Sequence, residues 1–219
     1  MNIEKIIHNK HAKKSRDLRP LRAFVDLYEA NNSAMEEIHK LTVSNSTKEA
    51  LLKSNIINLV TAIEVYYRDM LDAIFRLCKV SSYESSLRKI HDKNYKIDSI
   101  LNLYNKKIHP LELIVDAQNF QNLETIDKVF SIILKKSFLK SILQIEWKFD
   151  LEDKNSSSIS DQEIKIVKKV FEERHQLIHN PNMKYSITKD EIEDKVNAVF
   201  GLIMASDLVF IQFINENEI

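Results

Sequence analysis

Glycine, proline and cysteine are scarce in this chain, and each scarcity excludes a class of structure. The 219 residues include 1 Gly, 3 Pro and 1 Cys. So few turn formers cannot support many short strands, and helices should therefore dominate the fold. A single glycine also rules out a phosphate-binding glycine loop and a dinucleotide-binding fingerprint. Cys78 has no partner for an internal disulfide and suits a reducing cytosol, so we expect a cytoplasmic protein.

An excess of charge of one sign is also lacking. The chain has 32 basic and 32 acidic residues, so no overall field marks a protein that coats nucleic acid. A local basic cluster does precede residue 20, and it is either a solvated arm or a contact to RNA phosphates or to a partner. Its members are His8, Lys10, His11, Lys13, Lys14, Arg16 and Arg19. Residues 1–15 contain no continuous apolar run, so no signal peptide is expected.

One apolar segment is long enough to cross a membrane. Residues 196–214 are mostly apolar, but Asn197, Asp207 and Gln212 interrupt them. An aspartate in mid-span costs about 2.5–3.5 kcal/mol on insertion scales. We therefore interpret the segment as a helix buried on most sides, with surplus apolar surface for a second subunit, and expect no membrane partner.

Start signals place four long helices. Pro20 suits the first turn of a helix that continues to about residue 41. Three capping boxes open the other long helices, and they are Ser46-Thr47-Lys48-Glu49, Ser160-Asp161-Gln162-Glu163 and Thr188-Lys189-Asp190-Glu191. The predicted fold is all-α: an antiparallel four-helix bundle with an inserted set of short helices. One domain, 1–219, would hold a core bundle over roughly 17–80 and 160–215 and a helical insertion over 81–150.

The predicted insertion is more polar and more broken than the bundle. Short helices are expected near 83–91, 98–104 and 111–118, followed by one that ends at 134 and another over 138–147. Asn122 or Thr125 would cap the helix that ends at 134. A polar loop, 150–158, then leads to the third long helix.

An arginine interrupts the apolar stripe of the third long helix. Ile164, Val167, Phe171 and Ile178 share one stripe at helical spacing, and Arg174 is its fifth member. Burying an unpaired arginine is very costly, so this face should meet a carboxylate, a cleft or an interface.

Glu64 on the second long helix has two interpretations. It forms an i, i+4 surface pair with Arg68, or it is the partly buried partner of Arg174. Both interpretations remain open at the level of the sequence.

The end of the third helix carries a motif that resembles a known family. Arg174-His175-Gln176-Leu177-Ile178-His179 is similar to the R-polar-xxx-H signature of HEPN domains, the helical-bundle ribonucleases of prokaryotic toxin and antiphage systems. Its place fits too, because it ends the third of four main helices. A second resemblance, to HEPN proteins of the abortive-infection and RiboL-PSP-associated type, lies in the segment Ile63-Glu64-Val65-Tyr66-Tyr67-Arg68-Asp69-Met70-Leu71.

The resemblance implies metal-independent cleavage of RNA, by attack of the ribose 2′-hydroxyl to leave a 2′,3′-cyclic phosphate. His179 would be general base or acid and Arg174 would hold the scissile phosphate. His175 and Asn180 would assist, with Glu64, Tyr67 and Arg68 as further supporting residues. No metal or other cofactor is expected.

Expected partners follow from the same resemblance. An ideal helix places residues 174 and 179 about 140° apart, and HEPN domains pair two motif helices in one cleft. The resemblance thus implies a homodimer with a composite active site. It also implies a toxin or antiphage defence effector that acts on cellular RNA, with an antitoxin or regulatory protein as a candidate partner.

Three alternatives stand beside this interpretation. Arg174 could pair with Glu64 in a purely structural bundle, while His179 interacts with the negative end of its helix. A HEPN-like module could instead bind RNA or a partner protein without catalysis. A metal site is the third alternative, because His175 and His179 are one turn apart, and Glu172-x-x-His175 and Glu36-x-x-His39 have di-iron spacing.

Overall fold

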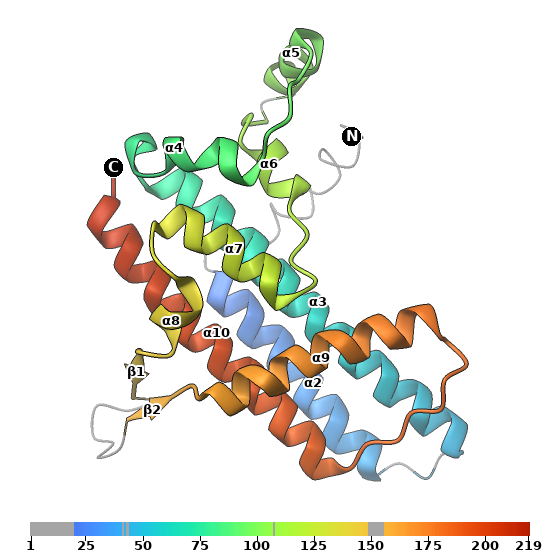
Figure 1. Ribbon diagram of the computed structural model, residues 1–219. Coiled ribbons are helices and arrows are strands. Elements are labelled where there is room, and N and C mark those ends of the chain that lie inside the picture. Colours follow the sequence, from blue (N-terminus) through green and yellow to red (C-terminus); the bar gives the residue numbers. More distant parts are fainter. Residues whose placement is uncertain (1–19, 41, 43, 107, 149–155) are drawn as a thin grey trace.

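The computed structural model describes residues 20–40, 42, 44–106, 108–148 and 156–219 (Figure 1). The predicted basic cluster before residue 20 and most of the predicted polar loop 150–158 lie outside these residues. Within them, nine helices and one pair of two-residue strands make up the fold, so the all-α prediction is confirmed. The helices are α2 (Pro20–Lys40), α3 (Asn45–Leu77), α4 (Val80–Ile90), α5 (Ile97–Asn105), α6 (Glu112–Ala117), α7 (Leu123–Leu134), α8 (Phe138–Ile142), α9 (Asp161–His179) and α10 (Lys189–Asn217). The antiparallel strands are β1 (Glu146–Trp147) and β2 (Ser157–Ser158).

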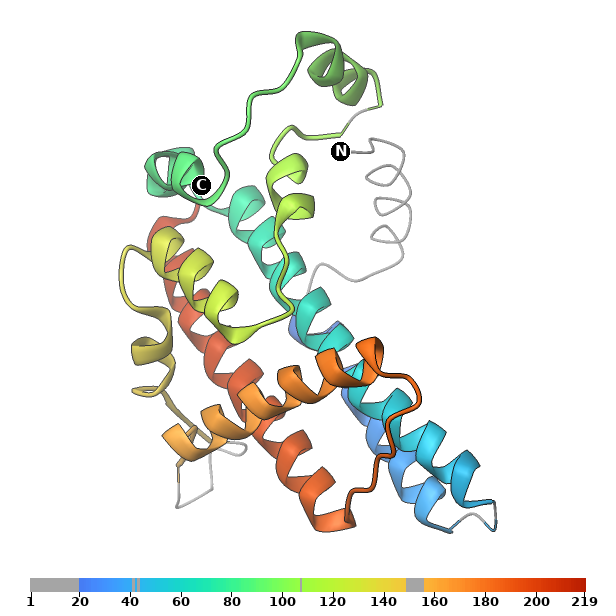
Figure 2. The same ribbon diagram turned by 45° about the vertical axis from the view of Figure 1, so that its right-hand side comes forward.

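The four long helices build the main body of the molecule. Helices α2 and α3 pack side by side as a hairpin, and α10 runs along both of them. Helix α9 lies across α3 and α10, as the two ribbon views show together (Figure 1 and Figure 2). This crossing leaves one side of α9 facing α10 and another facing the segment that leads into α7.

Capping explains where three of these helices begin. Ser160 and Thr188 form complete capping boxes with Glu163 and Glu191, as predicted. The predicted box at Ser46 is wrong, because Ser44 caps α3 by accepting a hydrogen bond from the Thr47 backbone N–H. The helix thus starts at Asn45, two residues earlier than a cap at Ser46 would place its start.

The second half of the predicted insertion belongs to the main core. Phe130 of α7 and Phe138 of α8 are completely buried, and their rings pack around Tyr67 of α3 and Phe210 of α10. Next to α5, a separate small cluster contains the buried residues Leu103, Ile108 and Leu113. Helix α5 projects from the body in both views (Figure 1 and Figure 2). The predicted insertion therefore divides into an outlying part and a part on which the bundle closes.

Helix α8 is shorter than predicted. It ends at Ile142, and the chain continues into β1 rather than remaining helical to residue 147. The other short helices lie within two or three residues of their predicted bounds, and Asn122 caps α7.

Helix α10 is the apolar segment whose composition would allow a membrane span. Its most apolar window has a mean hydropathy of 1.8, and 61% of that window is buried against the rest of the fold. Asp207 lies in this core, where it accepts a hydrogen bond of 3.0 Å from the Tyr66 hydroxyl. Burial raises the pKa of the Asp207 carboxyl. Asp207, one of the three polar residues that interrupt the apolar segment, therefore has a partner inside the bundle.

Candidate functional site

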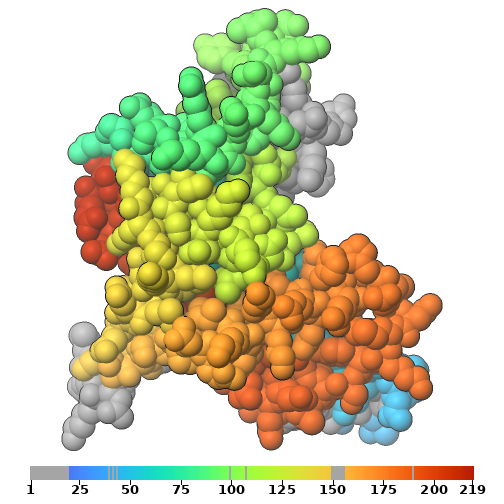
Figure 3. Space-filling view, viewed as in Figure 1, coloured from blue at the N-terminus to red at the C-terminus, as the bar shows by residue number. Residues whose placement is uncertain are grey.

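A cleft of about 570 Å³ separates α9 from the segment that leads into α7. Figure 3 shows the surface stepping inward where the yellow-green atoms of that segment meet the orange atoms of α9. Residues 119 and 121–124 form one wall. The wall from α9 consists of Phe171 and the polar or charged side chains of Lys168, Glu172, Arg174, His175, Gln176 and His179. The cleft is therefore open and mostly polar.

The apolar stripe of α9 places Arg174 at this cleft. Val167, Val170, Phe171 and Leu177 are buried, and Arg174 continues the same face as a half-buried residue. The predicted position of Ile178 on this stripe is wrong, since Ile178 is 43% exposed. Leu177, seven residues after Val170 and three after Arg174, occupies the buried position instead.

A neutral amide, not a carboxylate, contacts Arg174. Its Nη1 donates a hydrogen bond of 3.1 Å to Oε1 of Gln121. The Nε2 of Gln121 donates in turn to Oε2 of Glu64 at 3.2 Å, and the other oxygen of Glu64 pairs with Arg68 at 2.8 Å. Of the two interpretations of Glu64 that the sequence leaves open, the pair with Arg68 is therefore present and the direct pair with Arg174 is not. Among the residues that the structure describes, no carboxylate forms an ion pair with Arg174.

The two histidines of the motif lie together in the cleft. The ring centroids of His175 and His179 are 4.3 Å apart, with the rings tilted by 52°. Both side chains are exposed and line the same cleft as Arg174. One chain thus brings Arg174 and His179 to a common cleft despite their angular separation on the helix, because the residues of α9 that line the cleft cover a broad part of the helix surface.

Four of the five predicted supporting residues do not line the cleft. Glu64 contacts the lining residue Gln121 and Arg68 pairs with Glu64, whereas Tyr67 and Asn180 lie elsewhere. Tyr67 is completely buried, and its hydroxyl hydrogen-bonds to Ser206 at 2.8 Å, so it supports the core and does not line the cleft. Asn180 follows α9 as its C-cap residue, where its backbone N–H donates to the Gln176 carbonyl. Its side chain is exposed outside the lining of the cleft.

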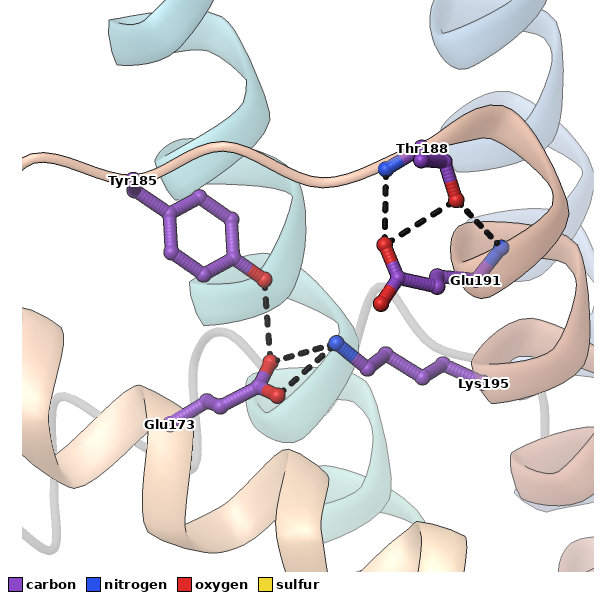
Figure 4. Close-up of polar contacts among 5 residues, drawn as sticks. All are labelled: Glu173, Tyr185, Thr188, Glu191 and Lys195. Atoms are coloured by element: carbon purple, nitrogen blue, oxygen red, sulfur yellow. Dashed lines mark hydrogen bonds and ion pairs between the residues drawn. The ribbon is translucent and has the colours of Figure 1, made fainter.

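A buried ion pair holds the opposite side of α9. Both oxygens of Glu173 accept hydrogen bonds from Lys195 of α10, at 2.7 and 2.8 Å, and one also accepts from the Tyr185 hydroxyl at 2.9 Å (Figure 4). Burial and the charge of Glu173 raise the pKa of Tyr185. Because Glu173 immediately precedes Arg174, this contact fixes the turn of α9 that carries the cleft residues.

The loop between α9 and α10 is also attached to α3. Glu49 accepts a hydrogen bond of 2.8 Å from the Tyr185 backbone N–H, and Lys53 donates to the Pro181 carbonyl at 3.3 Å. The residue predicted to complete a capping box, Glu49, therefore holds the chain beyond His179 in place.

Sequence reasoning missed the wall opposite α9. Asn119 and Gln121 line that wall, and Glu124 of the same wall forms an ion pair of 2.8 Å with Lys168 of α9 across the cleft. The local signal is the amide-rich run Gln118-Asn119-Phe120-Gln121-Asn122 around one aromatic residue. No periodicity connects this run with α9, which follows it some 40 residues later.

The metal alternative requires at least three ligand side chains close together. Over the described ranges, no three His, Cys, Asp or Glu side chains gather in a group that could hold a metal ion. His175 and His179 are thus a pair without a grouped third ligand there.

The fold and cleft define a class: a helical bundle whose third long helix presents an arginine and two histidines to an open cleft. The model of the RiboL-PSP-HEPN family matches residues 16–213, and the chain belongs to that family. The match extends through residues 81–150 as well as the main bundle. No curated protein and no solved structure matches the chain. HEPN domains are commonly ribonucleases, and membership thus points to an RNase-type or related function.

Proposed function

We propose that the protein is a metal-independent endoribonuclease whose cleft between α9 and residues 119–124 holds the scissile phosphate. One observation carries the proposal: Arg174 contacts a neutral amide and shares an open cleft with His175 and His179. The charge of a guanidinium without a carboxylate partner is not compensated, so it is available to bind a phosphate. The guanidinium can bind that phosphate through two parallel hydrogen bonds. An imidazole can both accept and donate a proton near neutral pH.

The proposed reaction needs one phosphate-binding group and two proton transfers. The ribose 2′-oxygen attacks phosphorus while its proton passes to a base, and the bond from phosphorus to the 5′-oxygen breaks as that oxygen takes up a proton. The products are a 2′,3′-cyclic phosphate and a 5′-hydroxyl. In the proposal Arg174 offsets the charge that develops on the phosphoryl oxygens, and His179 moves one of the protons. His175, which lines the same cleft, is assigned to the second proton transfer or to orienting the phosphate.

The setting of this activity is also part of the proposal. A toxin or antiphage defence effector would act on cellular RNA in the cytoplasm, under the control of an antitoxin or regulatory protein. A homodimer would place a second copy of the motif at the cleft, so that the active site is composite. The exposed end of α9, with Ile178 at 43% exposure, supports such a contact.

The decisive experiment is cleavage of RNA by the purified protein in the presence of EDTA. We expect cyclic phosphate ends in the wild type, a loss of rate of about 10²–10³-fold in Arg174→Ala, and a loss of about 10²–10⁴-fold in His179→Ala. Lys169→Ala is the matched control, because Lys169 is an exposed cation of α9 near Glu191 rather than at the cleft.

Each other outcome assigns a different function. Cleavage that EDTA abolishes would support the metal alternative and refute the proposal. Absence of cleavage with retained RNA or protein binding would indicate a non-catalytic HEPN-like module. If the protein is a toxin, cells should grow more poorly on induction of wild type than of His179→Ala.

A further inference from the structure

The segment that carries Gln121 is fixed at each neighbouring residue. Phe120 is completely buried, and its ring stacks on Phe130 with centroids 5.6 Å apart. Asn122 caps α7 by accepting a hydrogen bond of 2.7 Å from the Thr125 backbone N–H. The backbone N–H of Gln121 itself donates to the Asn119 side chain at 3.1 Å. This part of the loop therefore has little freedom, and Gln121 is presented to the cleft in a set position.

The contacts of Gln121 also set the direction of its amide. The Arg174 guanidinium can only donate hydrogen bonds and an ionised Glu64 carboxylate can only accept them. Gln121 satisfies both with one side chain, since its oxygen faces Arg174 and its nitrogen faces Glu64. The reverse orientation would place donor against donor and acceptor against acceptor.

In this series of contacts the negative charge of Glu64 is paired with Arg68 and not with Arg174. Glu64 forms its ion pair with Arg68, at 2.8 Å, and reaches Arg174 only through the amide. Nε of Arg174 is buried and has no hydrogen-bond partner among the residues that the structure describes. A carboxylate in place of Gln121 would form a charge-assisted pair with Arg174 and neutralise it, which a carboxamide cannot do.

We infer that Gln121 is the positioning residue of the cleft: its neutral amide orients the Arg174 guanidinium and separates it from Glu64, so that Arg174 keeps its charge for a substrate phosphate. The inference deepens the proposed function and rests on it for the identity of the phosphate as one of RNA. It assigns Gln121 no contact with the reacting atoms. It requires only that Arg174 bind a phosphate with its charge uncompensated.

Binding to an RNA analogue that cannot be cleaved tests the inference separately from catalysis. The probe is a fluorescein-labelled, fully 2′-O-methylated oligoribonucleotide, which lacks the attacking hydroxyl, and its affinity is measured by fluorescence anisotropy from 50 to 300 mM salt. In Gln121→Glu we expect weakening close to that of Arg174→Ala. The slope of log affinity against log salt should fall in magnitude by about 0.7, which corresponds to one lost phosphate contact on a single strand.

Two control variants separate the position of the charge from its amount. Gln144→Glu makes the same change in net charge at an exposed residue just beyond α8 and should leave the salt slope unchanged. The exchange variant Glu64→Gln/Gln121→Glu keeps the wild-type composition and allows an amide–carboxylate hydrogen bond at the same place. It should bind as weakly as Gln121→Glu if the charge beside Arg174 decides affinity, and like the wild type if Gln121 only holds the fold together.

The outcomes distinguish the inference from the proposed function. Weak binding by Gln121→Glu in a protein that never cleaves RNA would support the inference and refute the nuclease. Wild-type binding and cleavage by Gln121→Glu would overturn the inference and leave the nuclease standing. If the wild-type protein does not bind the probe, or binds it independently of Arg174, the inference is overturned with the phosphate site itself.

Discussion

The ion pair between Glu173 and Lys195 offers a sharp test of what holds α9 in place. The perturbation is Lys195→Met, which removes the ammonium but keeps most of the side chain's length. The Lys195 side chain is 11% exposed and that of Glu173 is 24% exposed, so the pair is largely shielded from water. After the substitution, the carboxylate of Glu173 would retain only the Tyr185 hydroxyl among its present partners.

The expected cost follows from this partial burial. Leaving one charge of a buried pair without its partner costs about 3–5 kcal/mol. Water can still reach Glu173, so we expect the lower end of that range, about 3 kcal/mol in the free energy of unfolding. For a chain of this length the melting temperature should fall by about 6–12 °C, since each kcal/mol corresponds to about 2–4 °C. Urea and thermal unfolding followed by circular dichroism measure both quantities.

A double-substitution cycle shows whether the reasoning is right. Glu173→Gln/Lys195→Met removes both charges, and it should recover most of the stability lost in Lys195→Met. Lys40→Met is the control, because Lys40 and Glu37 form an exposed pair, with both side chains about two-thirds exposed, and should lose less than about 0.5 kcal/mol. A loss of under about 1 kcal/mol in Lys195→Met, with no coupling in the cycle, would refute the assignment of this pair as a fixing contact.

Two further predictions concern the core helix α10. The folded-state pKa of Asp207 is raised by burial, so its contribution to stability is present below its unfolded pKa and is lost as pH rises through the folded value. Asp207→Asn should therefore gain stability relative to wild type as pH rises from 4 to 7 in unfolding titrations, and a difference that does not vary with pH would contradict this. Gly201→Ala should raise the free energy of unfolding by about 0.5–1 kcal/mol through helix propensity. Its added methyl would meet ordinary neighbours, with a Trp147 ring carbon at 3.9 Å and a Glu163 oxygen at 3.8 Å, and a lower melting temperature would show that these neighbours resist it.

Local signals in the sequence predicted the elements of the fold well. Ser160 and Thr188 start their helices with complete capping boxes, because a cap depends on residues within one turn of each other. The error at Ser46 has the same origin. Two serines compete within one turn, and Glu49, which seemed to complete the box, instead binds the Tyr185 backbone N–H 136 residues away.

The sequence predicted the residues of the candidate site that lie on α9 but not those on the opposite wall. The spacing of Arg174 within an apolar stripe indicated that it faces something other than solvent, and the histidines beyond it completed a motif. Its partner Gln121 lies 53 residues earlier, in a loop without periodicity. The contact forms because Phe120 enters the aromatic core around Tyr67 and carries its neighbour to α9. Such a contact depends on the packing of the whole core, and no local pattern contains that information.

Glu173 and Arg174 are consecutive residues on α9, and an α-helix places such neighbours about 100° apart. Glu173 binds Lys195 of the bundle, and Arg174 lines the cleft. A rotation of α9 about its long axis that turned Arg174 away from the cleft would also separate Glu173 from Lys195. Both charges would then lose their partner. The ion pair thus fixes the rotation of α9 relative to the bundle. A molecule that blocked the mouth of the cleft would inhibit the site without breaking the pair of Glu173 and Lys195, whereas a rotation of the helix would break that pair.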